Sequence, residues 1–187
     1  MTTTDDRGPA PSEVEDFWLR AIAAGIAEPG TPPPVVERFG DSSTMADALL
    51  DLVAHGPKRA TAGALADYQH HGDPLPVVGG HWIVADGRDR PRLVLETTDV
   101  RIGPLSSVDD AFAWDEGEGD RTRADWLRMH EGYFRRYLPT IGVPFHDDID
   151  VVFERFALVY AEEEAGSSAD SETPRPRWVG SADDGQH

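Results

Sequence analysis

Gly56-Pro57-Lys58-Arg59-Ala60-Thr61 is the stretch on which the fold assignment of this chain depends. Gly56 and Pro57 end a predicted helix, because neither residue continues a helical pattern well. The runs that follow Thr61 are rich in Val and Ile and are separated by Pro and Gly, which is typical of strands and turns. The hexapeptide therefore marks a junction between a helical part and a sheet.

Three helices are predicted from apolar residues spaced three and four positions apart. The first begins with a cap at Ser12, and the second begins at Thr44 with Asp47 completing a capping box. The third begins at Thr122, with Asp125 three positions on. The stripes expected to be buried are Val14, Phe17, Trp18, Ala21 and Ile22, then Met45, Ala48, Leu49, Leu52 and Val53, then Trp126, Met129, Tyr133 and Tyr137.

Strands are predicted at residues 81–85, 93–102 and 151–160, with a short extended segment at 35–39. The order of helices, strands, helix and strand favours an α+β fold with a mainly antiparallel sheet or small barrel over a doubly wound parallel sheet. On the strand at 93–102, Glu96 lies in phase with a face made of Val94, Thr98, Val100 and Ile102.

Length, composition and charge limit the class of protein. The 187 residues fit one domain at 12–160, between a disordered N-terminus at 1–11 and an acidic disordered tail at 161–187. A net charge of -18 makes duplex DNA an unlikely partner. The chain has no cysteine, no apolar run long enough to span a membrane and no recognisable leader, so we expect a cytoplasmic protein without disulfides.

Lys58 is the first candidate for chemistry. It is the single lysine among 17 basic residues, and an amine can act as a base whereas a guanidinium cannot. Thr61 becomes a nucleophile if a neighbouring base takes its proton, although the residue by itself favours a structural strand threonine that bonds locally. In a regular strand the two side chains would lie on opposite faces, so they converge only if the backbone bends between them.

Acidic residues supply the remaining candidates. Glu96, in phase with inward residues, is either paired or part of a site. Residues 115–120 hold four carboxylates just before the third helix, where they suit its N-terminus. Alternatively one of them, best Glu118, faces a pocket as an acid, a base or an acceptor.

Other ligand classes have weaker support. Arg121, Arg123 and Arg128 form the best local basic group for a phosphate. No glycine pattern for a nucleotide phosphate and no histidine spacing for a metal occurs, so we expect neither a metal nor a cofactor.

The hexapeptide also matches the pattern G-x-K-x-x-T, which opens ASCH domains of the PUA-like superfamily. Three further stretches resemble the larger bacterial ASCH subfamily: Arg38-Phe39-Gly40-Asp41-Ser42, Glu96-Thr97-Thr98-Asp99-Val100, and Glu116-Gly117-Glu118-Gly119-Asp120 leading to Ala124-Asp125-Trp126. The resemblance covers residues 12–160. It implies a small β-barrel with flanking helices and a cleft beside the G-x-K-x-x-T segment, for single-stranded RNA or a modified nucleoside.

Members similar to this chain differ in activity. Some deacetylate N4-acetylcytidine with a lysine, a threonine and a glutamate, and others cleave single-stranded RNA. Carried over, Lys58 is the base, Thr61 the nucleophile and Glu118 the third partner, with Glu96 as the substitute. The residues expected to bind the ligand are Arg59, Asp41, Ser42, Arg121 and Asp120. The alternative is a binding module without catalysis.

Overall fold

A computed structural model describes residues 9–162 of the chain, so the disorder predicted for 1–8 and 163–187 concerns residues outside the described range. The helices are α1 (Pro11–Ala23), α2 (Ser43–Ala54), α3 (Leu65–His71), α4 (Asp110–Glu116) and α5 (Arg123–Tyr137), with 3-10 helices at Leu105–Ser107 and Leu138–Ile141. The strands are β1 (Val36–Glu37), β2 (Ala60–Ala64), β3 (His81–Ala85), β4 (Pro91–Pro104) and β5 (Asp150–Ala161).

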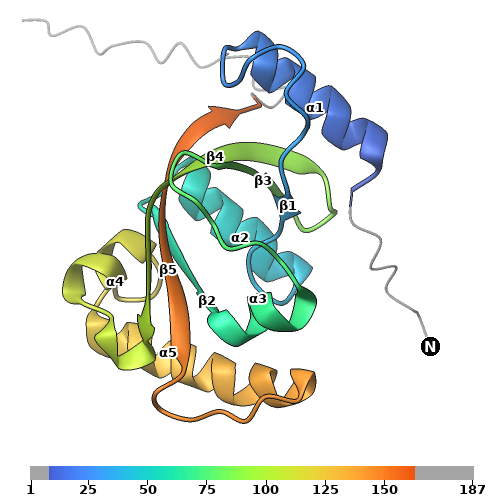
Figure 1. Cartoon of the computed structure of the whole chain (residues 1–187). Helices are drawn as coiled ribbons and strands as arrows, with labels where there is room; N and C mark the ends of the chain where they lie inside the picture. Colours follow the sequence, from blue (N-terminus) through green and yellow to red (C-terminus); the bar gives the residue numbers. More distant parts are fainter. Residues whose placement is uncertain (1–8, 163–187) are drawn as a thin grey trace, which may run out of the picture.

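The strands form one sheet in the order β1-β3-β4-β5-β2. Only the short β1–β3 pair is parallel, and the other three pairs are antiparallel, which confirms the predicted α+β class. The long strands β4 and β5 bend along their length (Figure 1), and their register shifts twice, between Val94 and Leu95 and between Thr97 and Asp99. Such shifts bend a strand and increase its twist.

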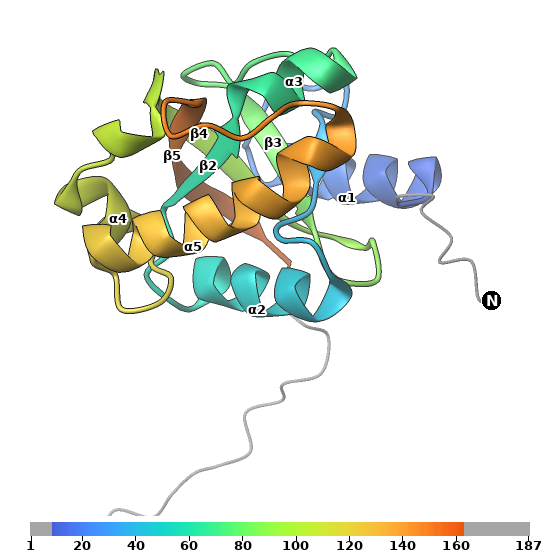
Figure 2. The same ribbon diagram turned by 90° about the horizontal axis from the view of Figure 1, so that it is seen from below.

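Helices cover both faces of this sheet. One helix, α1, lies across one side (Figure 1), and it buries Phe17 and Trp18 against β3 and β4. Seen from below (Figure 2), α5 crosses in front of the strands β2 and β5, and α2 lies beneath the strands on the page. There Val53 of α2 packs in one apolar cluster, while Trp126 and Phe134 of α5 pack in another with β2, β5 and α4. No helix within residues 9–162 has the length and apolar character needed to cross a membrane.

Of the three predicted helix starts, the one at Thr122 is confirmed, because its side chain accepts a hydrogen bond from the amide of Asp125. The cap at Ser12 is wrong: α1 begins at Pro11 and has no side-chain cap. The capping box at Thr44 is also wrong. Ser42 is in extended backbone and accepts from Met45 N at 3.3 Å, and Asp47 instead accepts from the amide of Gly87.

The buried face of α2 differs from the predicted stripe. Ala46 and Val53 are fully buried, whereas Met45 and Ala48 are exposed. The earlier start of α2 does not change the spacing of its side chains. The buried face differs from the predicted stripe because the helix turns Ala46, and not its neighbour Met45, toward the protein interior. In α1 the predicted Phe17, Trp18 and Ala21 are buried.

The predicted inward face of β4 is wrong beyond Leu95. The register shift between Thr97 and Asp99 interrupts the alternation, so Thr97 is buried and Thr98 is exposed. Ile102, which the alternation places inward, is also exposed. The structure further contains β2, α3 and α4, which the sequence patterns did not predict.

Candidate functional site

A pocket of about 550 Å³ lies between the β1–α2 loop, α2, β2, the α4–α5 connection and α5. Both α2 and α5, which are labelled in Figure 2, contribute residues to this pocket. The residues that line the pocket are Arg38, Phe39, Gly40, Asp41, Met45, Leu49, Lys58, Thr61, Ala62, Glu116, Glu118, Arg128, Met129, His130, Gly132, Tyr133 and Arg136. Lys58, Thr61 and Glu118 thus all line one pocket.

Lys58 is buried in this pocket, with 1% of its surface exposed. Its Nζ lies 2.5 Å from Oε1 of Glu118 and 3.5 Å from the carbonyl oxygen of Glu116. The amine also lies over the ring of Phe39, 5.2 Å from its centroid. A buried amine in contact with a carboxylate and an aromatic ring has a defined position, because each contact compensates for lost hydration.

The backbone around Lys58 is held by two helix ends. Its amide donates to the carbonyl of Leu52 in α2, and the amide of Arg59 donates to the carbonyl of Asp115 in α4. Gly117 ends α4 with a φ of +74°, and a Cβ there would lie 2.7 Å from the backbone nitrogen of Lys58. Only glycine permits both this conformation and this close approach. The carboxylates at 116 and 118 are thereby brought beside the lysine.

Glu116 and His130 form a second buried pair in the pocket. Glu116 is 2% exposed, and its Oε1 lies 3.3 Å from Nε2 of His130 and 3.9 Å from Nζ of Lys58. His130 stacks on the Trp126 ring, and its Nδ1 lies 3.0 Å from the carbonyl oxygen of Trp126. Burial by itself lowers the pKa of His130, but the Glu116 carboxylate outweighs that effect and the net pKa lies above the ordinary value.

Thr61 lies in β2, opposite Glu154 of β5, and its side chain is half-buried. Lys58 precedes this strand, and both residues line the pocket. Among the described residues, the Thr61 hydroxyl makes no hydrogen bond. A bound ligand or water can therefore reach that hydroxyl without displacing a protein partner.

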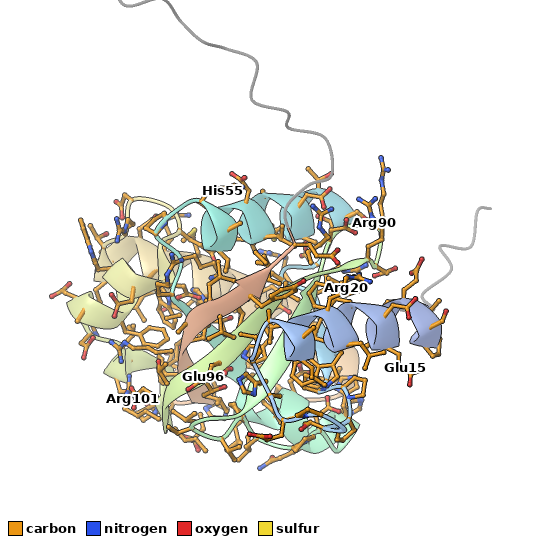
Figure 3. All side chains as sticks on the ribbon, turned by 90° about the horizontal axis from the view of Figure 1, so that it is seen from above. Glu15, Arg20, His55, Arg90, Glu96 and Arg101 are labelled. Carbon is orange, nitrogen blue, oxygen red and sulfur yellow. The ribbon has the colours of Figure 1, made fainter. Side chains whose placement is uncertain are left out.

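Glu96 lies outside the pocket. Its carboxylate faces His81, with 3.8 Å between Oε2 and Nε2, and its side chain is 42% exposed. Figure 3 shows Glu96 on the side of the sheet that carries α1, away from the side that α5 covers. The structure therefore brings Glu118, and not Glu96, to Lys58.

The predicted ligand-binding residues divide between the pocket and local structural contacts. Asp41 lines the pocket, whereas Ser42 caps α2. The guanidinium of Arg59 donates to the carbonyls of Val53 and Lys58. The hydroxyl of Ser42 and the guanidinium of Arg59 are thus both engaged in contacts within the protein.

In and next to the α4–α5 connection, polar side chains are likewise engaged in contacts with nearby protein groups. Arg121 stacks over the Trp114 ring and donates to the Trp114 carbonyl. Asp120 accepts from the amide and the hydroxyl of Thr122. Arg123 donates to backbone carbonyls of residues 106 and 108. Of the arginine group suggested for a phosphate, only Arg128 lines the pocket.

Sequence reasoning missed Glu116, His130 and Arg136 as pocket residues. A signal for His130 exists, because it lies four residues after Trp126 and one after Met129, on the face that the third helix turns inward.

The arginines of the pocket differ in their ion pairs. Arg128 is paired with Asp125, and Arg38 with Asp89. Arg136 has no ion pair within residues 9–162. That part of the chain also contains no cluster of three His, Asp or Glu side chains suited to a metal ion.

The chain is similar to known proteins both in sequence and in structure. The family model described as "ASCH domain" matches residues 36–160. A search of curated proteins found no match. A crystal structure from Enterococcus faecalis, described by the family model DUF984, is similar with 32% identity and a TM-score of 0.71 over 79% of this chain and 88% of that one.

A high-resolution crystal structure of an ASCH domain from Lactobacillus crispatus is similar with 25% identity and a TM-score of 0.72, over 83% of this chain and 98% of that one. The ASCH domain has a PUA-like fold and is generally associated with RNA, in agreement with the sheet and the flanking helices described above. The matched range contains the G-x-K-x-x-T segment, both pocket glutamates and all of α5. On these grounds the chain belongs to the ASCH domain family.

Proposed function

We propose that the pocket around Lys58 binds single-stranded RNA or a modified nucleoside and hydrolyses an amide on the nucleobase. The observation that supports this proposal most directly is the 2.5 Å contact between Lys58 Nζ and Glu118 Oε1 in a pocket that Thr61 also lines. An amine, a carboxylate and a hydroxyl are the groups that covalent amide hydrolysis requires.

The contact supplies a route for protons. Transfer of one proton from Lys58 to Glu118 leaves a neutral amine and a neutral acid. The amine then takes the hydroxyl proton of Thr61 as its Oγ attacks the amide carbonyl. When the C–N bond breaks, the acid of Glu118 protonates the leaving amine, which leaves an ester on Thr61. A second proton transfer from Lys58 to Glu118 then regenerates the neutral amine and the neutral acid. The amine deprotonates a water molecule, whose oxygen attacks the ester carbonyl, and the acid of Glu118 protonates the departing Thr61 oxygen, which restores the hydroxyl and releases the carboxylic acid.

A second function uses the same pocket without covalent chemistry. The specific observation in its favour is that Thr61 has no hydrogen bond to Lys58 or to any other described residue. In this alternative the pocket recognises a modified base or an RNA end, and Lys58 donates to a carbonyl or a phosphate. A ribonuclease variant would use Lys58, Arg128 and Arg136 to stabilise charge on a phosphate.

A product assay by mass spectrometry separates these possibilities. The parent protein, Lys58→Arg, Glu118→Gln and Thr61→Val are each incubated with N4-acetylcytidine and with a short single-stranded RNA. Amide hydrolysis predicts loss of the acetyl group by the parent and at least about a hundredfold slower loss by each variant. Arg88→Lys, an exposed swap outside this pocket, is the control and keeps the parent rate.

Two outcomes contradict the hydrolase. Deacetylation by Lys58→Arg at the parent rate excludes the proposed base. Intact substrates in all samples, together with salt-sensitive binding of the RNA, favour the binding module. RNA fragments that depend on Lys58 favour the ribonuclease.

A further inference from the structure

Glu116 has an unsatisfied oxygen at a buried position of the pocket. Its Oε2 is inaccessible to solvent and has no hydrogen-bond partner within the described residues, although the side chain belongs to the pocket lining. A buried polar atom without a partner costs about 1–3 kcal/mol, and more when the group is charged, so such atoms need an explanation. A ligand that donates a hydrogen bond to Oε2 provides one.

The neighbours of Glu116 define what Oε2 can do. The Trp126 carbonyl can only accept, so Nδ1 of His130 carries a hydrogen and donates to it. Nε2 of His130 faces Oε1 of Glu116. One proton lies between these two atoms, either on the imidazole or on Oε1. In both arrangements Oε2 carries lone pairs only, and it is therefore an acceptor.

The depth of Glu116 limits which part of a ligand can meet it. Glu116 is 2% exposed, whereas Arg128 and Arg136, which line the same pocket, are exposed. Met129 and Tyr133 of the lining are half-buried. A nucleoside enters with the edge of its base that is farthest from the sugar. In a pyrimidine nucleoside this edge carries the substituent at position 4, which is an amino group in cytidine and an oxygen in uridine.

We propose that Oε2 of Glu116 accepts a hydrogen bond from the exocyclic amino group of a nucleobase, and that the pocket selects amino-bearing bases over oxo-bearing ones. This inference rests on the proposed function, because it places a base in the Lys58 pocket. An oxygen at position 4 would face the lone pairs of Oε2 and leave both atoms without a donor. Sites built around a hydrogen bond reject ligands that lack the matching group strongly.

The experiment measures binding rather than turnover. Cytidine, uridine and N4,N4-dimethylcytidine are titrated by NMR into the full-length parent protein, Glu116→Gln, Glu118→Gln and the exposed control Glu15→Gln, whose position on α1 is labelled in Figure 3. We expect the parent to bind cytidine about tenfold more tightly than either other nucleoside, since a hydrogen bond to a charged group is worth about that factor.

The variants test which residue is responsible. Glu116→Gln reduces the cytidine-to-uridine ratio to about one, because an amide presents either an acceptor or a donor to position 4. Glu15→Gln and Glu118→Gln keep the parent ratio, even where Glu118→Gln weakens both nucleosides. Circular dichroism melting shows whether each variant is folded, and the dimethylated probe tests the same hydrogen bond without any substitution.

Three results overturn the inference: no binding of cytidine by the folded parent, equal binding of cytidine and N4,N4-dimethylcytidine, or a ratio that depends on Glu118 and not on Glu116. Its failure is distinct from failure of the proposed hydrolysis. A parent that deacetylates N4-acetylcytidine without preferring cytidine refutes only the role of Glu116. A parent that prefers cytidine through Glu116 without turnover refutes only the hydrolase.

Discussion

Asp86, in the turn between β3 and β4, and Glu116, at the end of α4, are both buried carboxylates with very different surroundings. Oδ1 of Asp86 accepts from the amides of Arg88 and Arg90, and its Oδ2 accepts from the guanidinium of Arg90. Glu116 has one oxygen near His130 and Lys58 and the other without a partner among the described residues. The Asp86 carboxylate, which maintains a turn, is saturated by neighbouring donors, whereas the Glu116 carboxylate keeps one open acceptor.

The largest expected difference is in stability. Asp86→Asn removes the charged partner of Arg90, and we expect the free energy of unfolding to fall by about 2–3 kcal/mol. Glu116→Gln, the same chemical change at the other site, is expected to cost less than about 1 kcal/mol, because the lost charge lies farther from its two partners, 3.3 Å from His130 and 3.9 Å from Lys58. Urea unfolding of both variants measures the difference. Equal losses would contradict the distinction between the two sites.

Asp86 also predicts a dependence on pH. Burial raises its pKa, but the hydrogen bonds from Arg90 outweigh this effect, so the net pKa is below the ordinary value. The contribution of Asp86 to the free energy of unfolding is therefore present above the pKa that this carboxyl has in the unfolded chain. It is lost as the pH falls through the lower pKa of the folded protein. The stability gap between parent and Asp86→Asn should narrow in acid, and a constant gap from about pH 7 to about pH 3 would refute this.

A smaller effect is expected at Gly117. Gly117→Ala puts an alanine at positive φ and a Cβ against the Lys58 backbone, so we expect a loss of about 1–2 kcal/mol and weaker nucleoside binding. Gly142 is the matched control: its φ is +76°, and a Cβ added there would meet no atom within 4 Å. Gly142→Ala should show the backbone cost alone, with unchanged binding. Unchanged binding in Gly117→Ala would mean that the close approach does not position Lys58.

The smallest expected effect concerns His130, which faces Glu116, the Trp126 carbonyl and, at longer range, Glu118. The net pKa of His130 is raised in the folded protein. Its contribution to stability is therefore full below the pKa of the unfolded chain and is lost as the pH rises through the pKa of the folded protein. The stability advantage of the parent over His130→Asn should thus decline by less than about 1 kcal/mol above about pH 6.5. A gap that grows with pH would contradict the pairing with Glu116.

Local signals explain which elements could be predicted. The start of α5 at Thr122 needs only a hydroxyl and an amide three residues apart, and β3 has a short apolar run that matches His81–Ala85. By contrast, β2 is Ala-Thr-Ala-Gly-Ala, a poor strand sequence that becomes a strand through pairing with β5. The helix α4 has only seven residues, although its cap at Asp109 and its final Gly117 were readable signals.

The candidate site residues divide in a similar way, into those that line the pocket and those that do not. Lys58, Thr61 and Glu118 were recognised from their residue types and their motif, and the structure puts all three in one pocket. Glu96 was in phase with inward residues, but a register shift in β4 and its place beside His81 separate it from that pocket. Arg59, Ser42, Arg121 and Asp120 have polar groups engaged in local contacts that depend on the exact backbone path.

The sequence by itself determined the α+β class, the helix that begins after Thr122 and three of the strands, and it singled out Lys58 as a candidate, because these follow from short-range patterns and from residue chemistry. The tertiary structure alone decided that β2 pairs with β5 and that Glu118 rather than Glu96 meets Lys58. It also decided that Glu116 has an open oxygen beside His130. Those facts depend on distances between residues far apart in the chain, which periodicity and spacing do not encode.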